Sequence, residues 1–124
     1  MSYELVFWRQ EAMMSRPSRE VYELLRSGER VEGLATLPLD DFLARIIEVC
    51  PGALRQSHGP TPSIEWDGGN GEDTFEVTWS EQHVLIDCRH VTLDVVNALV
   101  DVATSFSCPL YDPQTGERFR LVSP

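Results

Sequence analysis

The chain has 124 residues, of which 42% are hydrophobic, and this length and composition predict a single globular domain over residues 1–124. Twenty acidic residues against ten arginines, with no lysine, give a net charge of -10. This charge argues against partners such as nucleic-acid phosphates or anionic membranes, and no apolar run reaches the roughly 20 residues of a membrane-spanning helix.

The first predicted element is a strand over residues 3–8, with the sequence Tyr-Glu-Leu-Val-Phe-Trp. Side chains alternate between the two faces of a strand, so Leu5 and Phe7 share one face while Val6 and Trp8 share the other. Only Glu4 is polar, which indicates that both faces are covered. We therefore expect this strand to lie in the interior of a sheet.

Two helices are expected next. Apolar residues at helical spacing predict a first helix that begins near Pro17 or Ser18 and ends at Gly28. The second helix is predicted to take Asp40 as its N-cap and to stop at the Pro-Gly pair 51–52. Residues 52–62, with two further prolines, indicate a loop.

Three strands are predicted over residues 63–67, 74–80 and 82–88, with a glycine-rich turn at 68–71. The last two strands are separated by a short gap, and alternation is clearest in the 74–80 segment. This pattern is typical of an antiparallel meander with one buried and one polar face.

A third helix is predicted to begin at Thr92, and residues 110–112 and 118–122 then form a final hairpin or an edge strand. The predicted order is β-α-α-β-β-β-α-β. This is an α+β fold: an antiparallel sheet of four to five strands, with three helices mostly on one face.

The charge is unevenly distributed along the chain. No basic residue lies between Arg55 and Arg89, whereas this stretch contains seven acids: Glu65, Asp67, Glu72, Asp73, Glu76, Glu81 and Asp87. The predicted sheet therefore has edges and turns of one charge sign, which attract a basic partner. The alternative interpretation is that acidity only keeps the protein soluble.

Residues capable of catalysis or metal binding occur, but without a recognisable signature. Cys88 and His90, completed by Cys108 or His83, form only one close ligand pair, whereas zinc sites have two. A nucleophilic set of Cys88 or Ser80 with His83 or His90 and Asp87 can also be assembled, but it lacks a nucleophile elbow. Paired carboxylates for glycoside hydrolysis are also available, among Glu65, Asp67, Glu76 and Asp87. We therefore predict no catalytic residue, cofactor or metal.

Three cysteines, an odd number without close pairing, indicate reduced thiols, and the first residues lack the pattern of a signal peptide. A cytoplasmic protein is expected. Among the aromatic residues, Trp66 and Trp79 follow the inward alternation of their strands, while Trp8 at a strand end is predicted to be exposed. Exposed aromatic side chains beside acids are typical of a protein interface.

Residues 1–8, Met-Ser-Tyr-Glu-Leu-Val-Phe-Trp, and residues 108–114, Cys-Pro-Leu-Tyr-Asp-Pro-Gln, resemble a family of small, largely uncharacterised bacterial proteins. Some members are encoded beside type VI secreted or polymorphic toxins. The resemblance implies a non-enzymatic immunity protein that neutralises a cognate toxin by occluding its active site. The acidic stretch predicts that this active site lies in a basic cleft. The predicted contact residues are Glu65, Asp67, Glu72, Asp73, Glu76, Trp8 and Tyr111. The alternatives are a small hydrolytic enzyme or a housekeeping interaction module, and the oligomeric state stays open.

Overall fold

The computed structural model describes residues 2–11, 15–56, 62–68 and 73–118. Its strands are β1 (Ser2–Phe7), β2 (Leu54–Gln56), β3 (Ser63–Asp67), β4 (Thr74–Trp79), β5 (Val84–Arg89), β6 (Leu110–Asp112) and β7 (Glu117–Arg118). Its helices are α1 (Ser18–Arg26), α2 (Leu39–Val49) and α3 (Leu93–Ser105). The strands form one open antiparallel sheet in the order β2-β3-β4-β5-β1-β6-β7.

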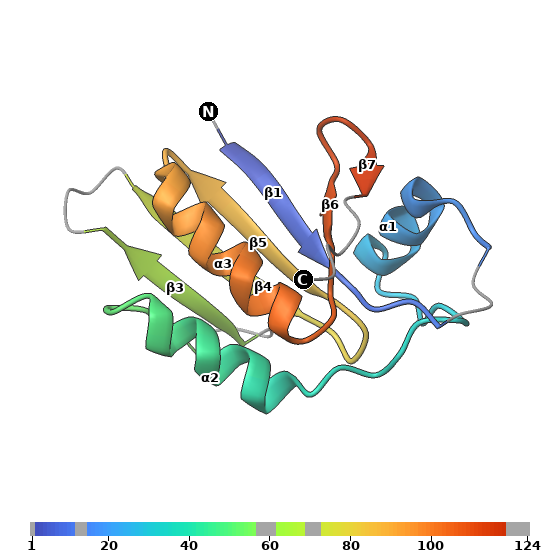
Figure 1. Cartoon of the computed structure of the whole chain (residues 1–124), viewed down its shortest axis with the longest axis horizontal. Coiled ribbons are helices and arrows are strands. Elements are labelled where there is room, and N and C mark those ends of the chain that lie inside the picture. The colour runs from blue at the N-terminus through green and yellow to red at the C-terminus, as the bar shows by residue number, and fades with distance from the viewer. Residues whose placement is uncertain (1, 12–14, 57–61, 69–72, 119–124) are drawn as a thin grey trace.

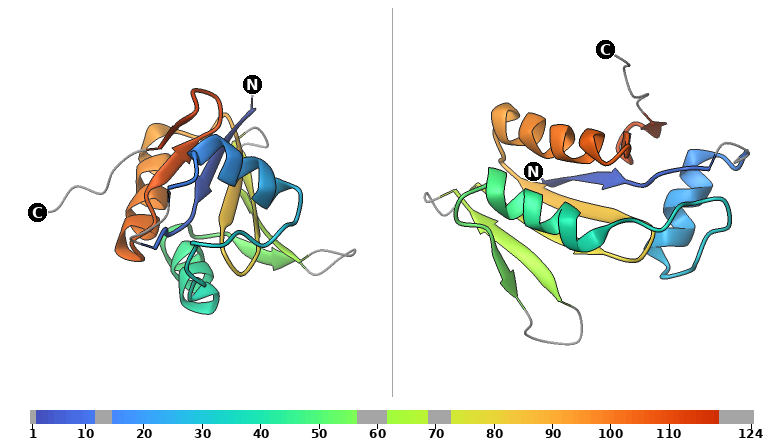
Figure 2. Two further views of the ribbon diagram at one scale, coloured as in Figure 1. Left: turned by 90° about the vertical axis from the view of Figure 1, so that its right-hand side faces the viewer. Right: turned by 60° about the horizontal axis from the view of Figure 1, so that its bottom comes forward.

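Helices cover the two faces of this sheet unequally. The larger core lies between the sheet and the α2–α3 layer, where Phe42 and Ile46 of α2 and Leu99 of α3 are buried. Helix α1 packs on the opposite face, where Val21 and Leu25 belong to a second, smaller core. Figures 1 and 2 show α1 at the β6 end of the molecule, separate from the α2–α3 layer. None of the three described helices covers the remainder of this second face, over β3, β4 and part of β5.

The central position of β1 is confirmed. It pairs with β5 on one side over all six residues and with β6 on the other side. Leu5 and Phe7 point into the larger core, and Val6 and Trp8 point into the smaller one. The apolar character of both faces of this strand therefore follows from helices packing on both sides of it.

The α+β class and the antiparallel meander are confirmed, but the described residues alone form a sheet of seven strands, more than the four to five predicted. The 52–62 segment was predicted to be a loop, yet residues 54–56 pair with β3 as an edge strand. Asp40 is not the N-cap of α2, because Pro38 occupies that position and Asp40 lies within the first turn. Among the described residues, no helix is long and apolar enough to cross a membrane.

Helices α1 and α3 end with the same backbone motif. After α1, the N–H groups of Gly28 and Glu29 bond to the carbonyls of Leu25 and Leu24. After α3, the N–H groups at 107 and 108 repeat this pattern. The motif requires a left-handed residue: Gly28 has φ 82°, whereas Ser107 takes the same role at φ 62°.

We expect Ser107→Gly to raise the free energy of unfolding by about 1 kcal/mol, because glycine removes the clash between Cβ and the backbone in this conformation. The matched change, Gly28→Ser, should lower it by a similar amount, since a Cβ there meets nothing within 4 Å and only the backbone strain counts. Urea unfolding of both variants measures the two effects. A loss of stability in Ser107→Gly would contradict the prediction.

Candidate functional site

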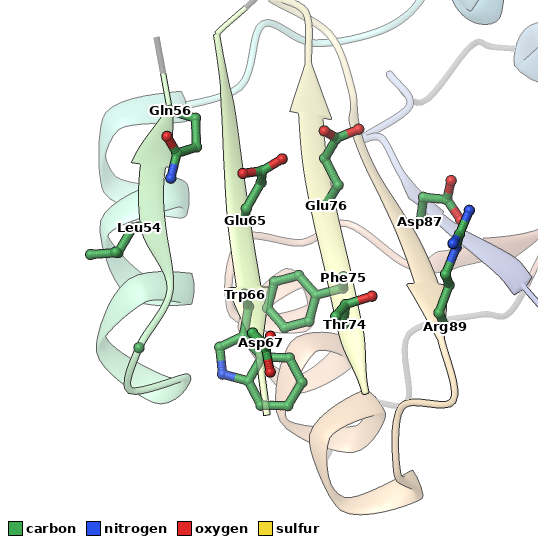
Figure 3. Close-up of a pocket in the computed structure, with 11 residues that line it drawn as sticks. Leu54, Gln56, Glu65, Trp66, Asp67, Thr74, Phe75, Glu76, Asp87 and Arg89 are labelled. Carbon is green, nitrogen blue, oxygen red and sulfur yellow. The ribbon is translucent and has the colours of Figure 1, made fainter. Parts of the chain in front are cut away.

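A row of acidic side chains crosses the sheet on the same face as α1, beginning where no described helix covers the sheet and ending beside α1 at Glu4. The strand register places Glu65 opposite Glu76, Glu76 opposite Asp87, and Asp87 opposite Glu4. Neighbouring strands lie about 4.8 Å apart, so these four acids follow one another closely across β3, β4, β5 and β1. We call Glu65, Glu76 and Asp87 the carboxylate row. Figure 3 shows these three side chains on adjacent strands.

Glu4, next to Asp87 at the β1 end, is neutralised by residues of α1. Its carboxylate accepts hydrogen bonds from the Tyr22 hydroxyl at 2.5 Å and from Arg26 at 2.7 and 3.0 Å. Among the described residues, no arginine forms an ion pair with Glu65, Glu76 or Asp87. Like charges directly opposite each other in a sheet are destabilising by roughly 0.2–1 kcal/mol per pair. The carboxylate row therefore opposes folding.

The carboxylate row borders a cavity of about 540 Å³. Leu54 of β2, which lies opposite Glu65, lines one side and is 63% exposed. Thr74 and Arg89, opposite each other on β4 and β5, line another part. The cavity therefore combines the three acids of the carboxylate row and Asp67 with one arginine and an exposed apolar side chain (Figure 3).

The acidic residues predicted to contact a partner do not all lie at this cavity. Glu65, Asp67 and Glu76 all line this cavity, as the alternation along their strands predicts. Asp73 lies beside it, and its backbone carbonyl accepts a hydrogen bond from Gly68 N–H at 2.8 Å. Glu72 lies outside the described residues. Asp87 was not among the predicted contact residues, although its outward position opposite Glu76 follows from the meander.

The prediction that Trp8 and Tyr111 are exposed contact residues is wrong, because both are fully buried. Helix α1 covers this part of the sheet, and the rings of Trp8 and Tyr111 pack 5.1 Å apart beneath it. Arg118 also lies over the indole ring of Trp8, with its guanidinium carbon 5.2 Å from the ring centroid. Both aromatic residues stabilise the smaller core and cannot reach a partner.

A second cavity, of about 560 Å³, lies between α1 and the turn that joins β4 to β5. Its lining includes Thr78 and Leu85 from the sheet, Arg26 from α1, and Ser80 and His83 from the turn. Ser80 Oγ lies 2.6 Å from His83 Nδ1 and also accepts a hydrogen bond from Gln82 N–H at 3.2 Å. Sequence reasoning considered Ser80 and His83 for catalysis and did not predict this cavity.

The Ser80–His83 contact is better explained by turn structure than by catalysis. The two residues flank a tight hairpin turn closed by a 3.0 Å hydrogen bond from Ser80 N–H to the His83 carbonyl. Burial lowers the pKa of His83 to about 4, well below the range near 7 that suits a general base. No carboxylate hydrogen-bonds to the ring among the described residues, so the orienting third member of a triad is not in place.

The three cysteines are free and buried. Burial raises the pKa of Cys88 to about 12, with a smaller contribution from Asp87, and burial raises the pKa of Cys108 to about 11. Such thiols are poor nucleophiles at neutral pH. Within the described part of the chain, no group of three histidine, cysteine or acidic residues is placed to hold a metal ion.

The sequence and structure were also compared with known proteins. No protein family, curated protein or solved structure matches this chain.

Proposed function

We propose that this protein is an immunity-type binding protein whose uncovered sheet face docks into the basic cleft of a cognate toxin and blocks that toxin's active site. The observation that carries the proposal is the carboxylate row: three acids in register on a part of the sheet that α1 does not cover, with no arginine paired to them among the described residues. The two chain ends resemble a largely uncharacterised bacterial family, some members of which are encoded beside toxins, and this resemblance supports the toxin as partner.

The arrangement of the acids is better explained by a role in binding a partner than by a role in keeping the protein soluble. Acids scattered over a surface raise solubility at little expense to the fold. A row of like charges on neighbouring strands lowers stability instead. Arginine or lysine side chains from a partner would relieve this repulsion on binding. Charge complementarity of this kind accelerates association and excludes wrong partners.

The surroundings of the row suit a protein partner. Leu54 extends the row at the β2 end with an exposed apolar side chain, and Glu4 ends it as an acid already paired with Arg26. A protein interface commonly combines an apolar contact with polar and charged groups around it. A toxin that acts on nucleic acid or nucleotides needs a basic cleft, so this class of toxin fits the row best.

The proposal predicts a specific loss of binding when the row is neutralised. The test variant carries Glu65→Gln, Glu76→Gln and Asp87→Asn, and the bait is the product of the adjacent open reading frame. We expect the association rate constant to fall roughly tenfold to a hundredfold at low salt, because exposed charges steer the encounter. The thermal midpoint should rise or stay unchanged, since repulsion within the sheet is removed. Surface plasmon resonance and thermal unfolding measure the two effects.

A matched control removes three negative charges from the α2–α3 layer, through Asp41→Asn, Asp94→Asn and Asp101→Asn. It should bind almost as wild type does, and both wild type and control should rescue growth of cells that express the toxin. If the row variant and the control lose the same fraction of the association rate, net charge rather than the row governs binding. If wild type neither binds the adjacent gene product nor rescues growth, the housekeeping-module alternative is favoured.

A further inference from the structure

Strand β2 lies at one end of the sheet, and among the described residues no other backbone segment pairs with its outer edge. An edge strand presents unpaired N–H and C=O groups with which a further strand can pair. β2 contains no proline, which would remove a donor from this edge. Leu54 and Arg55 are both exposed although they lie on opposite faces of β2, so the helix layer does not close over the edge. The sheet is therefore open to strand addition at β2.

On the outer face of β2, an exposed apolar side chain lies beside the end of the carboxylate row. Leu54 lies opposite Glu65 in the register, and both residues line the same cavity. Figure 3 shows the Leu54 side chain pointing away from β3, towards the free edge. An added strand would lie two strand spacings, about 10 Å, from the backbone of Glu65. An arginine can bridge this distance, because its aliphatic stem packs on apolar surface and its guanidinium pairs with a carboxylate.

The inner face of β2 favours the opposite charge. Arg55 lies opposite Ile64, which is buried in the larger core, so Arg55 points to the α2 side of the sheet. It forms no ion pair with another residue of the described part of the chain. A strand that pairs with β2 places one side chain directly opposite Arg55, where an acid is favourable. The edge therefore suits a strand that is basic on its outer face and acidic on its inner face.

A second copy of this chain fits the edge poorly. Each copy carries a net charge of -10, so joining two sheets through β2 would bring two strongly acidic molecules together. An antiparallel register centred on Arg55 would also place the two Arg55 side chains opposite each other, which is destabilising. Because β2 has only three residues, backbone pairing alone provides few hydrogen bonds. The side chains around the edge therefore select the occupant.

We infer that β2 pairs with an extended segment of the partner protein, in which an outward arginine reaches Glu65 over Leu54 and an inward acid meets Arg55. The inference rests on the proposed function for the identity of the partner. It adds the direction of approach, since the partner then contacts the edge of the sheet as well as the carboxylate row. In this binding mode the backbone hydrogen bonds contribute affinity and the alternate side chains determine specificity.

The test uses the isolated protein and two synthetic peptides of equal composition and charge. The first, acetyl-Val-Thr-Arg-Glu-Arg-Thr-Val-amide, presents both arginines on one face of a strand and the glutamate on the other. The second, acetyl-Val-Arg-Thr-Glu-Thr-Arg-Val-amide, places the arginines and the glutamate on the same face. NMR titration of labelled protein measures both affinities. We expect the first peptide to bind about fivefold tighter or more, because only its arginines can reach Glu65 while its glutamate meets Arg55.

The same titration shows where the first peptide binds. We expect amide shift changes centred on residues 54–56 and 63–65, together with slower hydrogen exchange of the β2 amides. Glu65→Gln should abolish the preference for the first peptide. Asp94→Asn, which removes one exposed acid from α3, is the matched control and should retain the preference. Both substitutions are at exposed positions, so both variants are expected to fold.

Binding of neither peptide, equal affinities for the two, or shift changes away from β2 and β3 would each overturn the inference. A preference that persists in Glu65→Gln, or that is lost equally in Asp94→Asn, would overturn it as well. No toxin is needed for these measurements. The edge inference and the immunity proposal can therefore fail separately.

Discussion

Replacing Gln82 with alanine is expected to lower the free energy of unfolding by about 3 kcal/mol. The Gln82 side chain is buried. Its amide group forms hydrogen bonds with the backbone of residues 31–34, in the way that the peptide group of a neighbouring strand does. Its Oε1 accepts from Val31 N–H at 2.8 Å, while its Nε2 donates to the carbonyls of Val31 at 2.8 Å and Leu34 at 3.3 Å. Alanine removes these bonds and leaves buried backbone groups without partners.

Gln114 provides the matched control, because its side chain makes the same kind of contact at an exposed site. Its Oε1 accepts from Glu4 N–H at 2.8 Å, and its Nε2 donates to the Glu4 carbonyl at 3.3 Å. Water can replace these bonds, so Gln114→Ala should lose less than about 1 kcal/mol. Guanidinium unfolding at pH 7 compares the two variants. Equal losses of unfolding free energy in the two variants would show that burial does not determine how much the Gln82 hydrogen bonds stabilise the fold.

Leu5→Asp is expected to destabilise the fold by about 4 kcal/mol or more, because it places an unpaired charge in the larger core. Leu5 is 5% exposed and lies opposite Ile86, in the centre of the sheet. Circular dichroism during thermal unfolding measures the effect, and the variant is expected to be largely unfolded at 37 °C.

Leu93→Asp makes the same substitution at a position that is 71% exposed, in the first turn of α3. It should change stability by no more than about 0.5 kcal/mol, since an acid at a helix N-terminus is favourable and little apolar contact is lost. An unchanged thermal midpoint in Leu5→Asp would contradict the burial of Leu5. A large loss of stability in Leu93→Asp would contradict the exposure of Leu93.

Strands in which apolar and polar residues alternate clearly could be predicted from the sequence. The 63–67 strand has the predicted bounds, and the inward positions Val84, Ile86 and Cys88 of β5 are all buried as predicted. Local pattern was enough here because each strand has one apolar and one polar face. The outward positions of Glu65 and Glu76 follow from the same alternation, so part of the candidate site was predictable as well.

Features determined by distant parts of the chain could not be predicted. The edge strand β2 has only three residues, two of them polar, and its existence depends on pairing with β3. Trp8 and Tyr111 become buried because α1 packs over them, and the helical pattern of α1 does not specify which part of the sheet it covers. The second cavity likewise requires α1 and the β4–β5 turn to come together.

Because inward and outward side chains alternate along β3, β4 and β5, the outer surface of the sheet can change in evolution independently of the core. Ile64, Val77 and Ile86 point into the core, and their neighbours Glu65, Glu76 and Asp87 point out of it. Substitutions in the outward set leave the inward packing untouched. A gene duplicate could therefore acquire a new binding preference through changes at a few codons, one after another, while every intermediate still folds.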